Sequence, residues 1–177
     1  MYYVKTGRSS RRNAIVSDAS SRMVRPPRYP MNTPVSVLLA RKGHSVQTIA
    51  ASATVADAVR LMNEKRIGAI VVTDQWRLAG IFTERDVLTR IVGAGRDPAL
   101  TLVAEVMSAN PHTITPMATT AEVMEIFTHE RCRHLPVLVD GKLAGLISIG
   151  DVSRWLTDTH KAEAEHLRQY ITGGYPP

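Results

Sequence analysis

The stretch of sequence that decides the fold occurs twice, as GIFTERD at residues 80–86 and as GLISIGD at residues 145–151. Each copy joins a short apolar run to a Thr or Ser, with an Asp three residues later. The copies are 65 residues apart, and the same offset relates TIAASATVAD at residues 48–57 to TITPMATTAE at residues 113–122 without a gap. Such internal similarity predicts two copies of one supersecondary unit.

Working outward from these stretches, the apolar pattern predicts the order β-α-β-β-α in each copy. In the first copy, residues 46–50 alternate like a strand and Thr54 is a candidate N-cap for the next helix. Residues 69–73 and 78–83 then read as a hairpin, and a helix follows over about residues 84–92. The second copy repeats this order. Its hairpin strands are expected at residues 135–139 and 143–148, and its short helix at residues 151–156.

The expected fold class is therefore α/β (α+β), with two β-α-β-β-α repeats related by pseudo-two-fold symmetry and a C-terminal helix at about residues 158–171. Two copies can bury sheet faces that one copy leaves exposed, and their junction creates two equivalent clefts. The expected segments are a basic tail, repeat 1, repeat 2 and the C-terminal helix with its tail, at residues 1–30, 31–97, 98–157 and 158–177.

The net charge of +6 resides in the tail, because residues 1–30 hold seven basic residues and one acid, while the remainder holds 15 of each. A neutral body argues against a nucleic-acid partner for the core. The tail is interpreted as a disordered extension preceding an alternative start at Met31, as an organellar transit peptide, or as a basic arm. A cytoplasmic protein is expected, with organellar import if the tail is a transit peptide.

Cysteine count and hydropathy exclude several classes. Cys132 is the single cysteine, which excludes an intramolecular disulfide framework and a paired-cysteine zinc site. No apolar run approaches the roughly 18 to 20 residues of a membrane span, so no membrane partner is expected. His160, Glu163 and His166 are spaced for one helix face, which is interpreted as a solvated face rather than a metal site. No metal is expected.

The two copies resemble the cystathionine-β-synthase (CBS) domain family, in tandem as a stand-alone Bateman module over about residues 35–157. RCRHLPV at residues 131–137 is similar to the start of a family strand, and RIGAIVV at residues 66–72 is its first copy. The resemblance implies a regulatory protein that binds an adenosine nucleotide, with AMP first and ATP, ADP or NAD as alternatives. It also implies a homodimer, signalling to an unidentified protein partner, and a role in energy sensing.

The chemistry of the motif agrees with this implication. A helix N-terminus favours an anion, and Thr83 and Ser148 can donate a hydroxyl to a phosphate there. Asp86 and Asp151 can accept the hydroxyls of a ribose. By the family pattern, the first site comprises Thr83, Arg85, Asp86, His112, Cys132, Arg133 and His134. The second site comprises Gln47, Ile67, Gly68, Ala69, Ser148 and Asp151.

Structural alternatives accompany each of these roles. Asp86 and Asp151 also suit plain N-terminal helix acids, and Thr83 also suits an N-cap. Gly150 stands where the first copy has Arg85, so the two sites are expected to differ in affinity or ligand.

The other function classes have less support. Cys132 and His134 share a strand face, but no third group orients them, so an enzyme is not expected. The main alternative to nucleotide sensing is a ligand-free dimerisation or adaptor module, and nucleic-acid binding is a weaker one.

Overall fold

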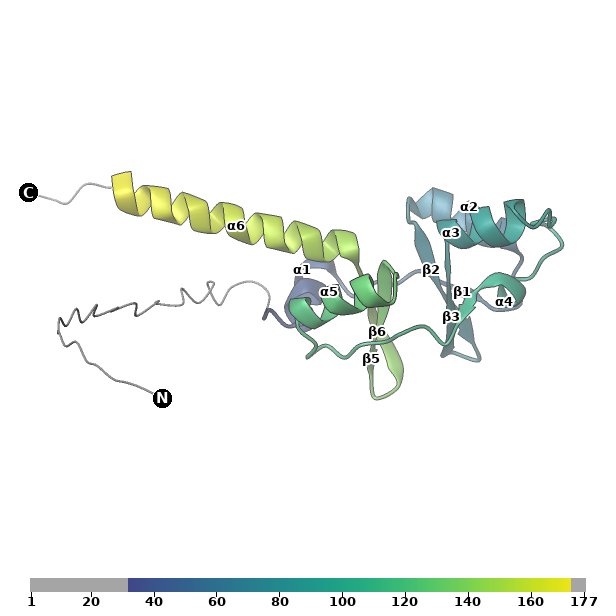
Figure 1. Ribbon diagram of the computed structural model, residues 1–177. Coiled ribbons are helices and arrows are strands. Elements are labelled where there is room, and N and C mark those ends of the chain that lie inside the picture. The colour runs from purple at the N-terminus through teal and green to yellow at the C-terminus, as the bar shows by residue number, and fades with distance from the viewer. Residues whose placement is uncertain (1–31, 173–177) are drawn as a thin grey trace, which may run out of the picture.

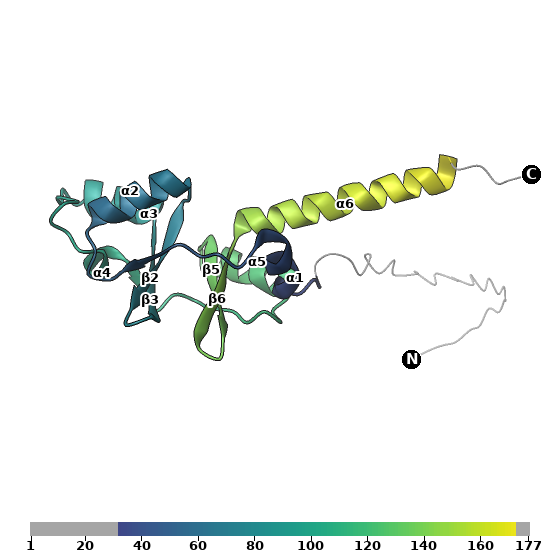
Figure 2. The same cartoon turned by 180° about the vertical axis from the view of Figure 1, so that it is seen from behind.

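The computed structural model describes residues 32–172, so the tail expected at residues 1–30 lies outside the described part. Two α/β halves lie side by side, and a long helix leaves the second half (Figure 1; Figure 2 from behind). The first elements in chain order are α1 (Val35–Lys42), β1 (Thr48–Ala50), α2 (Val55–Lys65), β2 (Ala69–Asp74), β3 (Arg77–Thr83), α3 (Glu84–Asp86) and the π-helical η1 (Val87–Val92). The remaining elements are α4 (Val103–Val106), β4 (Ser108–Ala109), α5 (Thr120–His129), β5 (His134–Val139), β6 (Lys142–Ser148) and α6 (Ile149–Thr172).

The first half is a four-stranded sheet in the order β1-β2-β3-β4, covered by helices. β1 and β2 are parallel because α2 connects them, whereas β2 and β3 form the predicted antiparallel hairpin. Thr54 caps α2 by accepting the N–H of Asp57 over 3.1 Å, as the sequence predicts. The buried core of this half consists of Val55, Ala58, Met62, Ile70, Val72, Phe82, Ile91, Val103 and Val106.

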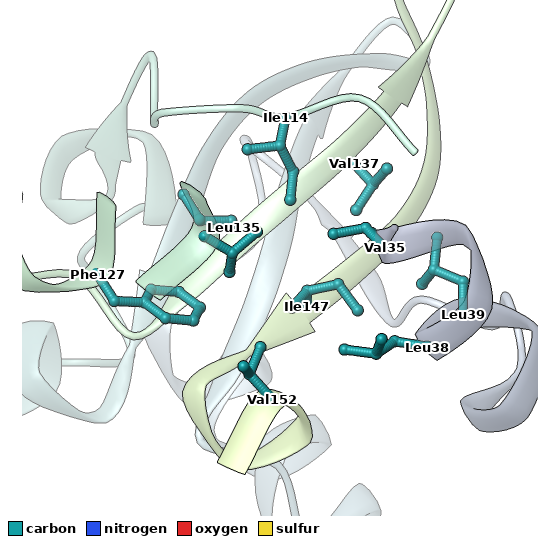
Figure 3. Packing of buried hydrophobic residues seen from close by; sticks show 10 residues of the cluster. Val35, Leu38, Leu39, Ile114, Phe127, Leu135, Val137, Ile147 and Val152 are labelled. Atoms are coloured by element: carbon teal, nitrogen blue, oxygen red, sulfur yellow. The ribbon is translucent and has the colours of Figure 1, made fainter. Parts of the chain in front are cut away.

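The second half is built on the hairpin of β5 and β6, with a single parallel bridge between Ile114 and Val137 where the sequence predicts a first strand. Helix α1 lies within the segment predicted as repeat 1 but packs into this second core, where Figure 3 shows Val35, Leu38 and Leu39 near Ile147. By its packing, α1 therefore belongs to the second half, whose other elements begin more than 50 residues further along the chain. The buried residues of this core are Val35, Leu38, Leu39, Ile114, Val123, Phe127, Leu135, Val137, Ile147 and Val152.

The glycine that begins each repeated motif is required by close packing. A Cβ on Gly80 would lie 2.6 Å from the sulfur of Met107, and a Cβ on Gly145 would lie 2.7 Å from a methyl carbon of Leu39. Both distances are below any normal carbon contact, so a side chain at either position would push neighbouring elements apart. The glycine of each motif therefore allows close packing of its strand, of β3 against Met107 and Ser108 and of β6 against α1.

The C-terminal region differs from its prediction. The sequence predicts two helices, at residues 151–156 and 158–171, but α6 is one continuous helix from Ile149 to Thr172. No Pro or Gly interrupts residues 151–172, and the hydroxyls of Thr157 and Thr159 donate to carbonyls one turn earlier, over 2.9 Å each. α6 extends beyond the second half (Figure 1). The mixed α/β fold with a C-terminal helix is confirmed.

Candidate functional site

The Thr–Asp motif of the first repeat forms a capping box at the start of α3. Asp86 Oδ2 accepts the backbone N–H of Thr83 over 2.9 Å and its hydroxyl over 2.7 Å. The backbone N–H of Asp86 donates in return to Thr83 Oγ1 over 3.4 Å. Both side chains therefore satisfy backbone donors that the helix leaves unpaired. A phosphate that accepted the Thr83 hydroxyl would have to draw it away from Asp86.

The second repeat builds the same box at the start of α6. Asp151 Oδ2 accepts the N–H and the hydroxyl of Ser148, over 2.8 and 2.7 Å. The two carboxylates differ in burial, because the Asp86 side chain is 7% exposed and the Asp151 side chain is 25% exposed. Equivalent motifs thus hold equivalent hydrogen bonds in different surroundings.

A cavity of about 480 Å³ lies between the two repeats. The seven residues predicted for the first site all line it, so residues more than 45 positions apart in sequence converge on one space. The lining residues are Ile81, Thr83, Arg85, Asp86, Thr89, Arg90, Ser108, Ala109, Asn110, Pro111, His112, Glu130, Arg131, Cys132, Arg133, His134 and Leu135. We call this space the first cleft.

Positive charge predominates in the first cleft, with four arginines against the carboxylates of Asp86 and Glu130. Arg90 lies 3.3 Å from Asp86 Oδ1 and donates to the carbonyl of Val106 over 2.7 Å. Glu130 is paired with His112 over 3.0 Å. Arginine guanidinium groups offer the forked donors that suit phosphate. The four arginines are Arg85, Arg90, Arg131 and Arg133.

Two of these arginines were missed at the sequence level, although signals for both exist. Arg90 follows Asp86 by four residues, which is the spacing of an ion pair on one helix. Arg131 is related by the repeat offset to Arg66, and both adopt a left-handed backbone, with φ of 50° and 53°. In each repeat this arginine therefore turns the chain from a helix toward the next strand.

His134 and Cys132 are held uncharged in the cleft wall. Burial, together with the nearby charges of Arg133 and Lys42, lowers the pKa of His134 to about 4, against the opposing effect of Asp151. Burial likewise raises the pKa of the Cys132 thiol. A thiol that stays protonated is a weak nucleophile.

The residues predicted for the second site are arranged differently. Asp151 lines a cavity of about 350 Å³ whose other walls are Leu38, Arg41 and Lys42 of α1 and Arg154 and Trp155 of α6. The other five predicted residues do not line this cavity. Burial of Asp151 opposes its ionisation, but hydrogen bonds from Lys42 and Ser148 outweigh it, so the pKa of this carboxyl lies below its ordinary value.

Most of the other residues predicted for the second site make contacts within the first half of the molecule. The carbonyl of Gln47 accepts the N–H of Val71 over 3.2 Å, and Ala69 pairs with Thr83 in the β2–β3 ladder. Ile67 packs against the first core. Gly68 lies against the side chain of Glu84, whose carboxylate oxygen would be 3.1 Å from a Cβ at that glycine.

Within residues 32–172, no three His, Cys, Asp or Glu side chains are grouped to hold a metal ion. His160 and Glu163 form a 3.6 Å pair on the exposed part of α6. In the same described range, every helix is too short or too polar to cross a bilayer.

Comparison with known proteins identifies the repeats. The family model described as CBS domain matches residues 16–93 and again residues 103–158. The chain belongs to the CBS domain family. A mitochondrial CBS domain-containing protein of Arabidopsis thaliana is 41% identical over 127 residues, which cover 69% of this chain. The matched part spans 62% of that relative's own length.

Solved CBS structures share the fold. A CBS-domain containing protein from Agrobacterium tumefaciens superposes with a TM-score of 0.66 at 41% identity, over 69% of this chain and 98% of that one. A CBS domain protein from Pyrobaculum aerophilum, solved in complex with AMP, has a TM-score of 0.60 at 24% identity and covers 67% and 88% of the two chains. At that identity the likeness establishes the fold. This chain thus carries two CBS domains in tandem.

Proposed function

We propose that the first cleft binds an adenosine nucleotide, AMP first, and that its occupancy is signalled to a partner protein. One observation carries the proposal: all seven residues expected around one nucleotide line a single cavity between the CBS repeats. A cavity of about 480 Å³ falls within the usual range for small-molecule sites, roughly 300 to 1,000 Å³.

Phosphate would bind at the arginine side of this cleft. Arg85 is the second residue of α3, two residues after Thr83, and Arg131 and Arg133 approach from the other repeat. These groups supply charge-assisted donors from both repeats, so a bound phosphate would link the two halves. This linkage supports a regulatory role, since a ligand that bridges two units can favour one of their relative arrangements.

Ribose and adenine would occupy the inner part of the cleft. Asp86 is 5% exposed and keeps Oδ1 in reach of Arg90 over 3.3 Å, so a ribose hydroxyl would compete for a carboxylate that is already held in place. The base would lie along the start of β5, beside Cys132 and the neutral His134. The AMP bound in the Pyrobaculum protein supports a monophosphate, and ATP, ADP and NAD remain the alternatives.

An adaptor without a ligand is the second candidate. The capping box supports it, because Thr83 and Asp86 already satisfy each other and the start of α3 without any bound group. The adaptor predicts that nucleotides leave thermal stability unchanged, whereas the sensor predicts stabilisation.

We also propose a homodimer formed through the outer helices. An apolar groove of about 900 Å³ separates α2 from η1, with Val59, Val87 and Ile91 in its walls. Leu88 and Val92 on η1 are 65% and 68% exposed, so a second chain that covered this face would bury apolar surface. Sedimentation of the full chain would give the dimer mass, and Val92→Asp would shift it to that of a monomer.

Two parts of the chain point to different cellular compartments. The body suits the cytoplasm, whereas the basic, Ser-rich residues 1–30 suit import into an organelle. The printed name of the Arabidopsis relative places that protein in mitochondria, which supports import. Residues 1–30 fused to a fluorescent protein test this. The fusion would enter the organelle if these residues direct import, and it would stay in the cytoplasm if they do not.

A thermal-shift panel on the full chain tests the sensor function. AMP, ADP, ATP and NAD are compared with GMP at matched concentrations. A ligand at about 100 times its Kd adds about 2.7 kcal/mol of stability, which is a shift of several degrees for a domain of this size. We expect a shift with an adenosine nucleotide, loss of the shift in Asp86→Asn, and retention in the exposed control Asp74→Asn. Unchanged melting with every nucleotide would favour the adaptor.

A further inference from the structure

We infer that Lys42 closes the second cleft of this chain, so that one nucleotide binds per chain, in the first cleft. The inference rests on the proposed function and goes beyond it by naming the residue that makes the clefts unequal. Lys42 Nζ lies 2.6 Å from Asp151 Oδ2 and also donates to the carbonyl of Leu146 over 3.1 Å. Asp151 is the carboxylate that a ribose would need in the second cleft.

The repeat offset shows what Lys42 replaces. Sixty-five residues after Lys42 stands Met107, followed by Ser108 and Ala109 of β4. β4 covers the edge of β3, pairing Ala109 with Gly80 and Ser108 with Ile81. The corresponding edge of β6 is covered by the segment at residues 42–44, where Lys42 binds Leu146 and His44 Nδ1 lies 3.3 Å from the carbonyl of Ala144. The same position thus carries a thioether in one repeat and an ammonium in the other.

The equivalent carboxylates of the two repeats, Asp86 and Asp151, each contact a cation, but in different ways. Arg90 approaches Asp86 from the same helical stretch, bonds Oδ1 over 3.3 Å and lies in the wall of a cleft that stays open beside it. Lys42 comes from α1 and bonds Oδ2, the oxygen that already accepts two hydrogen bonds from Ser148. The cavity beside Asp151 has Lys42 in its wall and faces α1 and α6.

The repeat 1 side of the second cleft is also less suited to a nucleotide than the equivalent part of the first cleft. The Glu84 carboxylate lies over Gly68, whose backbone was expected to contact the base. The offset places Ile149 where the first repeat has Glu84, and Gly150 where it has Arg85. A nucleotide in the second cleft would therefore meet an added acid and lose an arginine, and it would have to displace Lys42 from Asp151.

Stoichiometry of AMP binding to the full chain tests the inference, by equilibrium dialysis at saturating AMP. The wild type is expected to bind one AMP per chain and Lys42→Met to bind two, the second more weakly. Lys42→Met copies the residue at the equivalent position of the other repeat, which keeps the apolar stem. Arg41→Met is the matched control, because Arg41 pairs with Asp158 over 2.6 Å and leaves Asp151 untouched; it is expected to bind one.

A second pair of variants isolates the second cleft. Asp86→Asn is expected to bind no AMP, and adding Lys42→Met to it is expected to restore one AMP per chain, whereas adding Arg41→Met restores none. Lys42→Gln serves the same purpose if Lys42→Met unfolds. If the wild type binds two AMP per chain, or if the wild type and Lys42→Met both bind one, the role of Lys42 is overturned but the proposed function of the first cleft stands. Absence of AMP binding in every variant would overturn the proposed function and this inference together.

Discussion

Arg85, at the start of α3 in the first CBS repeat, donates a hydrogen bond from its guanidinium to the backbone carbonyl of Arg131 in the second repeat, over 3.3 Å. This contact joins two residues that line the first cleft, one from each repeat. The guanidinium therefore stands next to the space where a phosphate would bind and already ties the repeats together. A ligand phosphate would accept the same donors, so binding would exchange a weak link between the repeats for a stronger one.

Replacing Arg85 with Gln is expected to weaken AMP binding about tenfold. A hydrogen bond to a charged group contributes about 1.5 kcal/mol or more, and about 1.4 kcal/mol corresponds to tenfold in affinity. Arg60→Gln is the control, since Arg60 pairs with Asp57 on α2, outside the cleft. Titration calorimetry measures both. An unchanged affinity in Arg85→Gln would remove Arg85 from the phosphate site.

The stability of the protein should fall as pH drops from about 6.5 to about 4. Burial lowers the pKa of His134 to about 4 in the folded protein, so over this window the unfolded chain binds the proton more readily. Protonation then favours unfolding, by about 3 kcal/mol at most across the window. Chemical unfolding at pH 7 and at pH 4.5 measures the loss.

Two histidine variants separate this effect from general acid denaturation. His134→Gln should flatten the pH dependence between about 6.5 and 4, whereas His129→Gln, at the exposed end of α5, should keep it. The carboxyl of Asp151, whose pKa lies below its ordinary value, contributes stability that is lost only at still lower pH. A wild-type slope that persists in His134→Gln would show that another group is responsible.

Gly80→Ala should destabilise the first repeat by roughly 1 to 3 kcal/mol, because the new methyl would lie 2.6 Å from the sulfur of Met107 and 2.8 Å from the carbonyl oxygen of Ser108. Gly150→Ala is the matched control in a helix, where the nearest atom would be 3.6 Å away. It should be neutral or should stabilise α6, since Ala is favoured over Gly in helices. Equal melting temperatures for the two variants would contradict the close approach of β3 and β4.

Leu39→Ala should cost about 2 to 5 kcal/mol of stability, because Leu39 is 1% exposed and fills the second core. Val37→Ala on the same helix should cost much less, since Val37 is 41% exposed. Hydrogen exchange would place the loss in β5 and β6 rather than in β2 and β3. Loss of protection confined to the first half would show that α1 belongs to that half.

Local patterns in the sequence were enough to predict much of this fold. The offset of 65 residues placed both hairpins, and Thr54 and Thr119 accept the N–H groups expected of helix caps, from Asp57 and Glu122. These features depend on neighbours within a few residues or on the repetition itself. The residues that line the first cleft could be predicted because the repeated motif and the start of β5 both resemble sequences of the CBS family.

The features that were missed depend on contacts between distant residues. Lys42 and Asp151 are 109 residues apart, and nothing near either one indicates that they meet. Helix α1 could be assigned to a core only by its packing, because its apolar face fits either half by composition. The predicted break before residue 158 was wrong. Thr157 and Asp158 are weak helix formers, but they lie in the middle of α6, where helical residues continue on both sides.

Binding of AMP at the first cleft is the property on which the sensor function depends most directly. Titration calorimetry of AMP into the full chain, with Asp86→Asn and Asp74→Asn in parallel, measures this. We expect saturable binding by the wild type and by Asp74→Asn, and no measurable binding by Asp86→Asn over the same range of AMP concentration, because the carboxylate that would bind ribose is replaced by an amide. Binding that is equally tight in Asp86→Asn, or no heat of binding from the wild type, would contradict the account.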